Sequence, residues 1–292
     1  MRWKKARRSD NVVDQRGSRR QVGGKGLSLA AVALIIVVGL ISGQDPLQIV
    51  SNIAGQAIQQ GGINTGAHNS KQPTVVQQNA QTEFVRAILG DTEDTWRSLF
   101  KQAGKHYADP TLILFSGSVR SACGFADAAV GPFYCPADQQ VYLDLSFFKE
   151  MEQRFAATGE FAQAYVIAHE VGHHVQTLLG VSAKVHAARQ RGESVKGHNG
   201  LLVRQELQAD CFAGVWAHHA QQRHAWLEPG DLADALNAAQ AIGDDRLQKQ
   251  AHGHVVPDSF THGTSAQRER WFSQGYKTGN VSQCDTFTAQ RL

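Results

Sequence analysis

The chain has 292 residues, of which 42% are hydrophobic, and its 29 basic and 26 acidic side chains give a net charge of +3. This hydrophobic content, with five Trp and a mean hydropathy of −0.33, excludes both wholesale disorder and a polytopic membrane protein. The charge is unevenly distributed, because residues 1–26 carry nine basic and two acidic side chains, which is +7 for this segment and −4 for the rest.

An uncharged apolar segment follows the basic one. Residues 26–44 carry no charged side chain, and a helix of this length would span about 28 Å, enough for the hydrocarbon core of a bilayer. The positive-inside rule then predicts a basic cytoplasmic tail over 1–26 and a single transmembrane signal anchor over 27–43. A cleaved signal peptide and a buried soluble helix are the alternatives, although no A-x-A cleavage pattern is present. Beside this segment, the basic tail favours anionic lipid over nucleic acid as a partner.

Residues 44–81 have a different composition, with nine Gln and few charges. Such a segment has little apolar surface to offset the entropy lost on ordering, so we expect a flexible polar tether. From residue 82 onward the hydrophobic pattern is that of a folded protein, and about 210 residues are enough for one core. We therefore predict a single domain over 82–292.

The domain is predicted to be α+β and mostly helical. Helical spacing of apolar residues from Phe84 predicts a first helix, and Asp91 or Thr92 is expected to cap a second. Strands are predicted over 111–115 and 140–145, where β-formers follow one another or alternate with polar-tipped residues. The remaining predicted helices cover residues 146–157, 160–179, 201–222, 230–241 and 264–275.

All four cysteines lie in this domain. An even number of cysteines beyond a membrane favours disulfides, and of the three possible pairings we prefer Cys123–Cys135 with Cys211–Cys284. The first would close a short loop rich in Gly, stabilising the fold by about 3 kcal/mol in the loop-entropy model. The alternative, thiolate ligands for zinc, would need C-x-x-C spacings that the sequence lacks.

The sequence His169-Glu170-Val171-Gly172-His173 lies within an apolar helical segment. Residues four apart share one face of a helix, so His169 and His173 are predicted to bind a single Zn²⁺. Glu170 is rotated by about 100° from His169 and is expected to reach a water molecule rather than the metal itself. The alternative is a chance match in a chain with 13 His.

A third ligand is expected on the next long apolar helix, where Glu206 and Asp210 are again four residues apart. A metzincin would have Gly at 176 and His at 179, but Gln176 and Leu179 stand there. We predict that Glu206 completes the metal site and that Asp210 orients His169 through its other ring nitrogen. Two carboxylates that face the protein interior would need a cation to compensate their charge. Taken without the first helix, the spacing of Glu206 and Asp210 would equally fit a solvated helix face.

Two further polar residues lie near the C-terminus, around the start of a predicted helix with Thr264 or Ser265 as its N-cap. His262 is expected either to stabilise negative charge on a reacting oxygen or to hydrogen-bond a carboxylate that binds the metal. The alternative is that it only anchors the start of this helix. Arg268 is expected to pair with a buried carboxylate.

These motifs resemble those of the bacterial family of putative neutral zinc metallopeptidases. The likeness rests on H-E-V-G-H-H, E-L-Q-A-D-C-F-A-G and H-G-T-S-A-Q-R-E-R-W-F, together with G-P-F-Y-C-P and V-Y-L-D-L-S-F-F upstream, and covers about 82–290. The chain also resembles the wider gluzincin class, which implies a zincin-like domain, Zn²⁺ and a peptide or protein substrate. In the membrane branch of that class an H-P-x-x-x-x-R element follows; here His262 and Arg268 keep the spacing, while Gly263 replaces the Pro.

We therefore expect a zinc-dependent peptidase held in the bacterial inner membrane by one helix, with its domain periplasmic or otherwise extracytoplasmic and Glu170 as the general base. The strand Val141–Leu145 is expected to be the sheet edge that aligns the substrate. The alternatives are a non-catalytic, zinc-stabilised binding or chaperone-like envelope protein, and an envelope adaptor with structural zinc. The sequence does not predict the oligomeric state.

Overall fold

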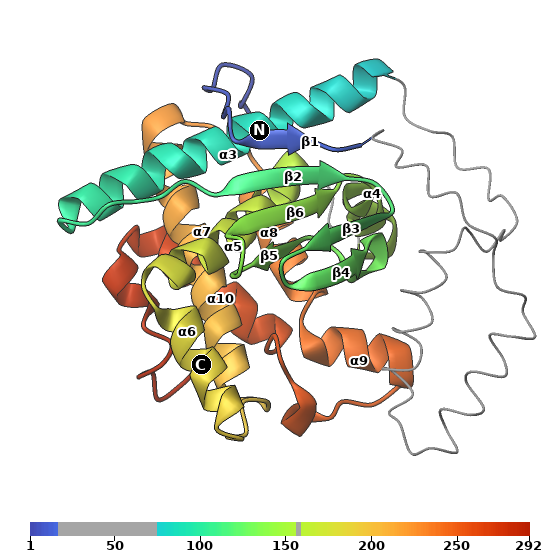
Figure 1. Ribbon diagram of the computed structural model, residues 1–292, viewed down its shortest axis with the longest axis vertical. Coiled ribbons are helices and arrows are strands. Elements are labelled where there is room, and N and C mark those ends of the chain that lie inside the picture. The colour runs from blue at the N-terminus through green and yellow to red at the C-terminus, as the bar shows by residue number, and fades with distance from the viewer. Residues whose placement is uncertain (17–74, 156–158) are drawn as a thin grey trace, which may run out of the picture. The chain divides into compact units, whose positions relative to one another are not determined.

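The computed structural model describes residues 1–16, 75–155 and 159–292, which fold into a mostly helical α+β unit, as predicted (Figure 1). Its helices are α3 (Val75–Gln102), α4 (Ser146–Phe155), α5 (Glu160–Leu178), α6 (Val181–Gln190), α7 (Leu201–His224), α8 (Asp231–Ala241), α9 (Asp244–His252) and α10 (Ser265–Thr278), with 3-10 turns η1 (Ala128–Val130), η2 (Pro257–Ser259) and η3 (Val281–Cys284). Its strands are β1 (Val12–Asp14), β2 (Thr111–Phe115), β3 (Ser118–Ser121), β4 (Gly124–Asp127), β5 (Phe133–Cys135) and β6 (Gln140–Asp144).

The main sheet has the strand order β1-β2-β6-β5. Strands β1, β2 and β6 run parallel, whereas β5 pairs antiparallel with β6 and forms one edge of the sheet. Strands β2 and β6, the two predicted from sequence, are buried along almost their whole length, as expected for parallel strands covered by helices. Strands β3 and β4 form a separate hairpin. Helix α5 packs against β5 and β6 and also against α7 and α8, which places it at the centre of the unit.

The first sixteen residues belong to this same folded unit. Strand β1 pairs with β2, with Val12 opposite Leu112, and Trp3 is buried in the core with its ring edge-to-face against Phe84. This part of the predicted basic tail therefore does not lie apart from the domain. The predicted anchor over 27–43 and most of the predicted tether fall outside the described residues.

A buried carboxylate holds this N-terminal segment on α3. Glu93 accepts hydrogen bonds from Ser9 Oγ at 2.5 Å, Asn11 Nδ2 at 2.8 Å and the guanidinium of Arg7 at 2.7 Å. Both Ser9 and Glu93 are completely buried. A buried carboxylate is stable only where its oxygens are satisfied in this way, so the segment and α3 depend on each other.

Helix α3 is one continuous helix, and it begins at Val75, inside the predicted tether. The predicted break at Asp91 and Thr92 was wrong, because a tertiary contact takes up the carboxylate of Asp91 and a bond within the helix takes up the hydroxyl of Thr92. The hydroxyl of Thr92 donates to the carbonyl of Leu89 at 2.7 Å, and the carboxylate of Asp91 accepts from the indole of Trp216 at 2.9 Å. Both residues are buried within the helix rather than at its end.

The five other predicted helices are present with ends shifted by up to three residues. Two helices were not predicted. Helix α6 is separated from α5 by a turn at Gly180, which is in the left-handed conformation, and α9 is short and rich in charged residues, so its apolar periodicity is weak. Among the helices in the described ranges, none combines the length and the apolar composition that crossing a membrane requires.

Both preferred disulfides are present in the structure. The bridge Cys123–Cys135 links the β3–β4 hairpin to strand β5, and Cys211–Cys284 links α7 to the turn η3 near the C-terminus. No described cysteine is free. The two bridges therefore fasten one edge of the sheet and the C-terminal segment.

Candidate metal centre and catalytic cleft

Two neighbouring helices bring together the three predicted metal ligands. Helix α5 carries His169 and His173, and α7 carries Glu206. The helices come close because α5 has a glycine at the contact: a Cβ atom at Gly172 would lie only 3.0 Å from the carbonyl oxygen of Ala209. The small residue inside the H-E-x-x-H motif therefore sets the separation of the two helices at the site.

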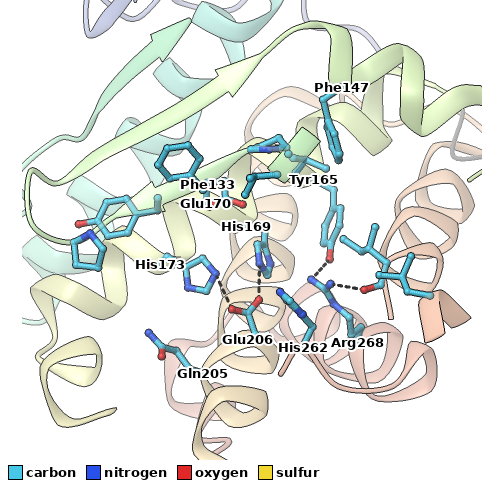
Figure 2. A pocket seen from close by; sticks show the side chains of 18 of the residues that line it. Phe133, Phe147, Tyr165, His169, Glu170, His173, Gln205, Glu206, His262 and Arg268 are labelled. Carbon is cyan, nitrogen blue, oxygen red and sulfur yellow. Dashed lines mark hydrogen bonds and ion pairs between the residues drawn. The ribbon is translucent and has the colours of Figure 1, made fainter. Parts of the chain in front are cut away.

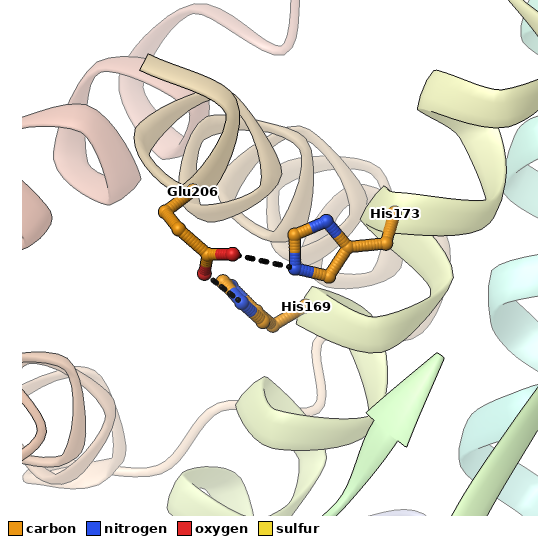
Figure 3. A group of neighbouring side chains, drawn as sticks. All are labelled: His169, His173 and Glu206. Carbon is orange, nitrogen blue, oxygen red and sulfur yellow. Dashed lines mark hydrogen bonds and ion pairs between the residues drawn. The ribbon is translucent and has the colours of Figure 1, made fainter. Parts of the chain in front are cut away.

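The ligand atoms of these three side chains converge on one point (Figure 3). His169 Nε2 lies 3.2 Å from Glu206 Oε2, and His173 Nε2 lies 3.4 Å from Glu206 Oε1. A tetrahedral zinc site with bonds of about 2.0–2.1 Å has edges of about 3.3 Å, so both separations suit this ion. Within the described residues, these three side chains are the set whose ligand atoms all lie within 4.8 Å of one another.

The charges around the triad also fit a divalent cation. Glu170, Glu206 and Asp210 gather here beside a single buried guanidinium, that of Arg268. Burial alone would lower the pKa of His169, but Asp210 and Glu206 raise it to about 10. Burial likewise opposes ionisation of Glu206, yet the two imidazoles hold the pKa of its carboxyl well below the usual range. The excess negative charge is what a bound Zn²⁺ would neutralise.

Asp210 contacts His169, the partner predicted for it, and it is also the buried carboxylate that pairs with Arg268. Its Oδ1 accepts a hydrogen bond from His169 Nδ1 at 2.8 Å. Each of its two oxygens also accepts a hydrogen bond from a nitrogen of the Arg268 guanidinium, both at 2.9 Å. The hydroxyl of Tyr165, which the sequence did not single out, also donates to Oδ1 at 2.6 Å. These hydrogen bonds direct Nε2 of His169 towards the metal position. Although burial opposes ionisation, Arg268 and His169 lower the pKa of Asp210 to about 2.

Helix α10 delivers Arg268 to this carboxylate. Its N-cap is Thr264, and a capping box with Gln267 fixes its first turn. Farther along, a Cβ atom at Gly275 would lie 2.0 Å from the carbonyl oxygen of Cys211, so α10 packs directly against the backbone of α7. Arg268 lies one turn into the helix and is 1% exposed.

The triad lines an open cleft of about 590 Å³, within the size range of small-molecule sites. Glu170 lines the same cleft, and burial raises the pKa of its carboxyl. Phe133 of β5 and Phe147 of α4 line it as well (Figure 2). A carboxylate of raised pKa beside a metal site is the arrangement expected for a general base.

Comparison with known proteins agrees with this geometry. The family described as putative neutral zinc metallopeptidase matches residues 1–287. The chain belongs to that family. Its relatives include the uncharacterized protein YpfJ of Escherichia coli K12, 47% identical over 98% of this chain and 99% of the relative. Another is the uncharacterized protein Rv2575 of Mycobacterium tuberculosis H37Rv, 45% identical over 72% of this chain and 73% of the relative. No solved structure matches significantly.

The family assignment and the donor set together support Zn²⁺ as the cofactor. The match also begins at residue 1. This agrees with the structure, in which the N-terminal residues contribute a strand and a core side chain to the same unit as the metal site.

Besides Tyr165, a second residue that contacts the site was not predicted. Gln176, completely buried on α5, lies beside His173, and its Oε1 is 2.9 Å from Nδ1 of that ring. In the sequence, this Gln stands where a metzincin would have Gly. Its spacing of three from His173 was the available signal, but a buried amide partner also depends on how α7 packs against α5.

His262 lines the cleft together with Glu206 and Arg268 (Figure 2). Its loop is held by Asp244, the first residue of α9, whose Oδ2 accepts three successive backbone N–H groups, those of residues 261, 262 and 263, at 2.6–3.0 Å. Nδ1 of the His262 ring lies 3.3 Å from Oδ1 of the same carboxylate. Burial would lower the pKa of His262, but Asp244 and then Glu206 raise it.

Proposed function

We propose that the protein hydrolyses peptide bonds as a zinc-dependent peptidase. The observation that carries the proposal is Glu170, which lines one cleft with the three ligands of a zinc site and follows the first of them in the chain. A zinc ion bound by His169, His173 and Glu206 would polarise the scissile carbonyl and make a water molecule more acidic. A site in which zinc only stabilised the fold would not need this carboxylate.

Glu170 acts on the proton of the attacking water. Its carboxylate accepts that proton as the water oxygen bonds to the carbonyl carbon, and returns it to the amide nitrogen as the C–N bond breaks. Burial raises the pKa of Glu170, so its protonated form, which exists between the two proton transfers, is more stable than it would be in water. No proton is gained or lost by the enzyme over the cycle.

His262 supplies a hydrogen bond to the substrate oxygen on which negative charge develops. Nδ1 of its ring lies 3.0 Å from the hydroxyl of Thr261 and 3.3 Å from Oδ1 of Asp244. When Nδ1 donates to the carboxylate, which only accepts, Nε2 carries a proton in the imidazolium form. The raised pKa of His262 supports this form. A donor placed where charge develops stabilises the transition state more than the bound substrate.

The substrate backbone is expected along β5 rather than along Val141–Leu145. Most of that segment is strand β6, which lies between β2 and β5 and has no free edge, so the expectation from sequence was wrong. Strand β5 ends the sheet, and its residues Phe133 and Tyr134 line the cleft. An extended peptide added there would run past the zinc ligands.

Replacing Glu170 by Gln tests the proposal, because the change keeps the size of the side chain and removes the base. We expect Glu170→Gln to bind zinc as tightly as the wild type while cleavage of a peptide library falls by at least about 10²-fold. Equal cleavage by both proteins would overturn the assignment. Zinc binding without cleavage by either would favour the zinc-stabilised binding protein.

We further propose that the domain works outside the cytoplasm, at the bacterial inner membrane. The two disulfides support an oxidising compartment, and the uncharged segment over 27–43 supports membrane attachment. The single-span arrangement with a cytoplasmic tail is not retained, because it would separate β1 from β2 across the bilayer. We place residues 1–16 on the same side as the domain.

A further inference from the structure

Beyond the zinc ligands, a chain of buried side-chain amides leads away from the site. It begins at His173, passes through Gln176 and Gln208, and ends at the backbone of Cys284, with links of 2.9, 3.1 and 3.0 Å. It runs from α5 through α7 to the turn η3, and both glutamine side chains are buried. Neither amide occupies a fixed position of the H-E-x-x-H or E-x-x-x-D motif, although Gln208 lies within the second.

The orientation of each amide is fixed by the last partner in this hydrogen-bonded series, the backbone carbonyl of Cys284. The carbonyl oxygen of Cys284 can only accept, so Gln208 presents its NH₂ group there and its oxygen to Gln176. Gln176 must then present its NH₂ group to that oxygen, and the same group donates to the carbonyl of Gln205 at 2.7 Å. Its own oxygen is therefore left for Nδ1 of His173, which must be the donor.

This sequence of donors selects one tautomer of His173. With its proton on Nδ1, the neutral ring has a free electron pair on Nε2, the atom that faces Glu206 at 3.4 Å. The two imidazoles of the site are thus oriented by different chemistry. His169 donates to a carboxylate that a guanidinium neutralises, whereas His173 donates to an uncharged amide.

We propose that Gln176 is a positioning residue for the zinc site, which presents His173 to the metal in its binding tautomer and ties that tautomer to the packing of α5 against α7. The proposal rests on the zinc site of the proposed function and not on peptidase activity. A partner of this kind typically changes metal affinity by 10–100-fold when it is removed. Because the amide carries no charge, it orients His173 without adding to the negative charge that the three carboxylates already supply.

Three variants of the full chain test this role by zinc affinity, measured by chelator competition at fixed pH. Gln176→Leu removes both the acceptor and the donors at similar size. Gln176→Glu keeps an acceptor for His173 but loses the donors to Gln205 and Gln208. Gln240→Leu is the matched control, because it breaks a different amide contact between helices, that of Gln240 with Glu269 at 2.7 Å, which involves none of the metal ligands.

We expect Gln176→Leu to weaken zinc binding about 10–100-fold and Gln240→Leu to leave it unchanged. Gln176→Glu should bind zinc more tightly than Gln176→Leu even though both unfold at a lower temperature than the wild type when stripped of metal. The absorption spectrum of the Co²⁺-loaded protein should shift in Gln176→Leu, since one ligand is no longer held. A purely structural Gln176 would lower the unfolding temperature alone.

Unchanged zinc affinity in Gln176→Leu, or equal losses in the Leu and Glu variants, would overturn the proposal. Failure of the proposed function is a separate result, because a wild-type protein that binds zinc but cleaves no peptide still allows every one of these affinities to be compared. The metal-stripped proteins are first compared by circular dichroism, so that a variant that does not fold is recognised before titration.

Discussion

Nδ1 of His169 donates to Oδ1 of Asp210 at 2.8 Å, so a zinc ligand on α5 is coupled directly to a completely buried carboxylate on α7. The same carboxylate holds the buried guanidinium of Arg268. A single residue thus orients a ligand and compensates a cation from a third helix. Removing it should affect both the metal site and the packing of the helices that form it.

Asp210→Ala tests this double role. We expect the free energy of unfolding to fall by about 3–5 kcal/mol, because the variant leaves Arg268 buried without a counter-charge. Zinc affinity should fall by about 10–100-fold. Arg191→Ala is the control, since it breaks an exposed ion pair with Glu193 and should change stability by no more than about 1 kcal/mol. Urea unfolding that does not separate the two variants would contradict the role of Asp210 in the fold.

The imidazolium form of His262 gives a pH dependence. Asp244 raises the pKa of His262 above the usual 6.5. The imidazolium is therefore fully present at pH values below 6.5 and is lost as the pH rises through the raised pKa. The wild-type kcat should therefore fall on the alkaline side, and the stability that the Asp244–His262 pair contributes should fall over the same range. His262→Ala should lower kcat by about 10²–10³-fold and leave a residual activity without this alkaline decrease. A residual activity that keeps the decrease would assign it to another group.

How much of the site could be predicted depends on whether its geometry is local. His169 with His173, and Glu206 with Asp210, are each four residues apart on a helix, so the sequence alone places each pair on one face. The contact between Gln176 and His173 is also local, but its orientation is set by the carbonyl of Cys284, which only the fold brings near. Spacing in the sequence therefore predicts the metal ligands, but not a side chain such as Gln176, whose orientation depends on further partners distant in the sequence.

The fold shows the same division. Strands β2 and β6 were predicted because their residues are strongly β-forming, whereas β1 has three residues in a basic segment and gains its stability from pairing with β2. Asp91 resembles a helix cap in sequence, and only the contacts from α7 explain why its carboxylate is buried inside α3. Composition likewise indicated a tail and a tether at residues that the structure places in a strand and a helix.

Because residues 1–16 belong to the folded unit, replacing a buried residue there should strongly lower the stability of the domain. Trp3→Ala should lower the free energy of unfolding by about 3–5 kcal/mol, because it removes a buried aromatic side chain from the core. Val13→Ala, in the same segment but 44% exposed, should have a much smaller effect. Denaturant titration of the full chain gives both values. Equal, small effects would show that the segment is not part of the folded unit in solution.

Thiol labelling in intact cells tests the same-side placement of residues 1–16. All four native cysteines are bridged, so a cysteine introduced at Lys5 or at Lys105 is the single free thiol of its variant. Both lysines are exposed, one in the N-terminal segment and the other just after α3. A membrane-impermeant maleimide should label both variants before lysis. Labelling of Lys105→Cys alone would restore the single-span arrangement, and labelling of neither would place the domain in the cytoplasm.

The two disulfides should differ in what their removal does to the site. Replacing Cys123 and Cys135 by Ala opens a loop of 12 residues and should cost about 3 kcal/mol, whereas the corresponding pair at Cys211 and Cys284 closes 73 residues and should cost about 4 kcal/mol. The first bridge ends on β5, the edge proposed for the substrate, so its loss should raise KM and leave zinc affinity unchanged. The second positions the carbonyl that orients Gln208, so its loss should weaken zinc binding. Chelator competition measures zinc affinity and peptide kinetics measure KM in the two double variants. The same change in both variants, whether in zinc affinity or in KM, would contradict this division.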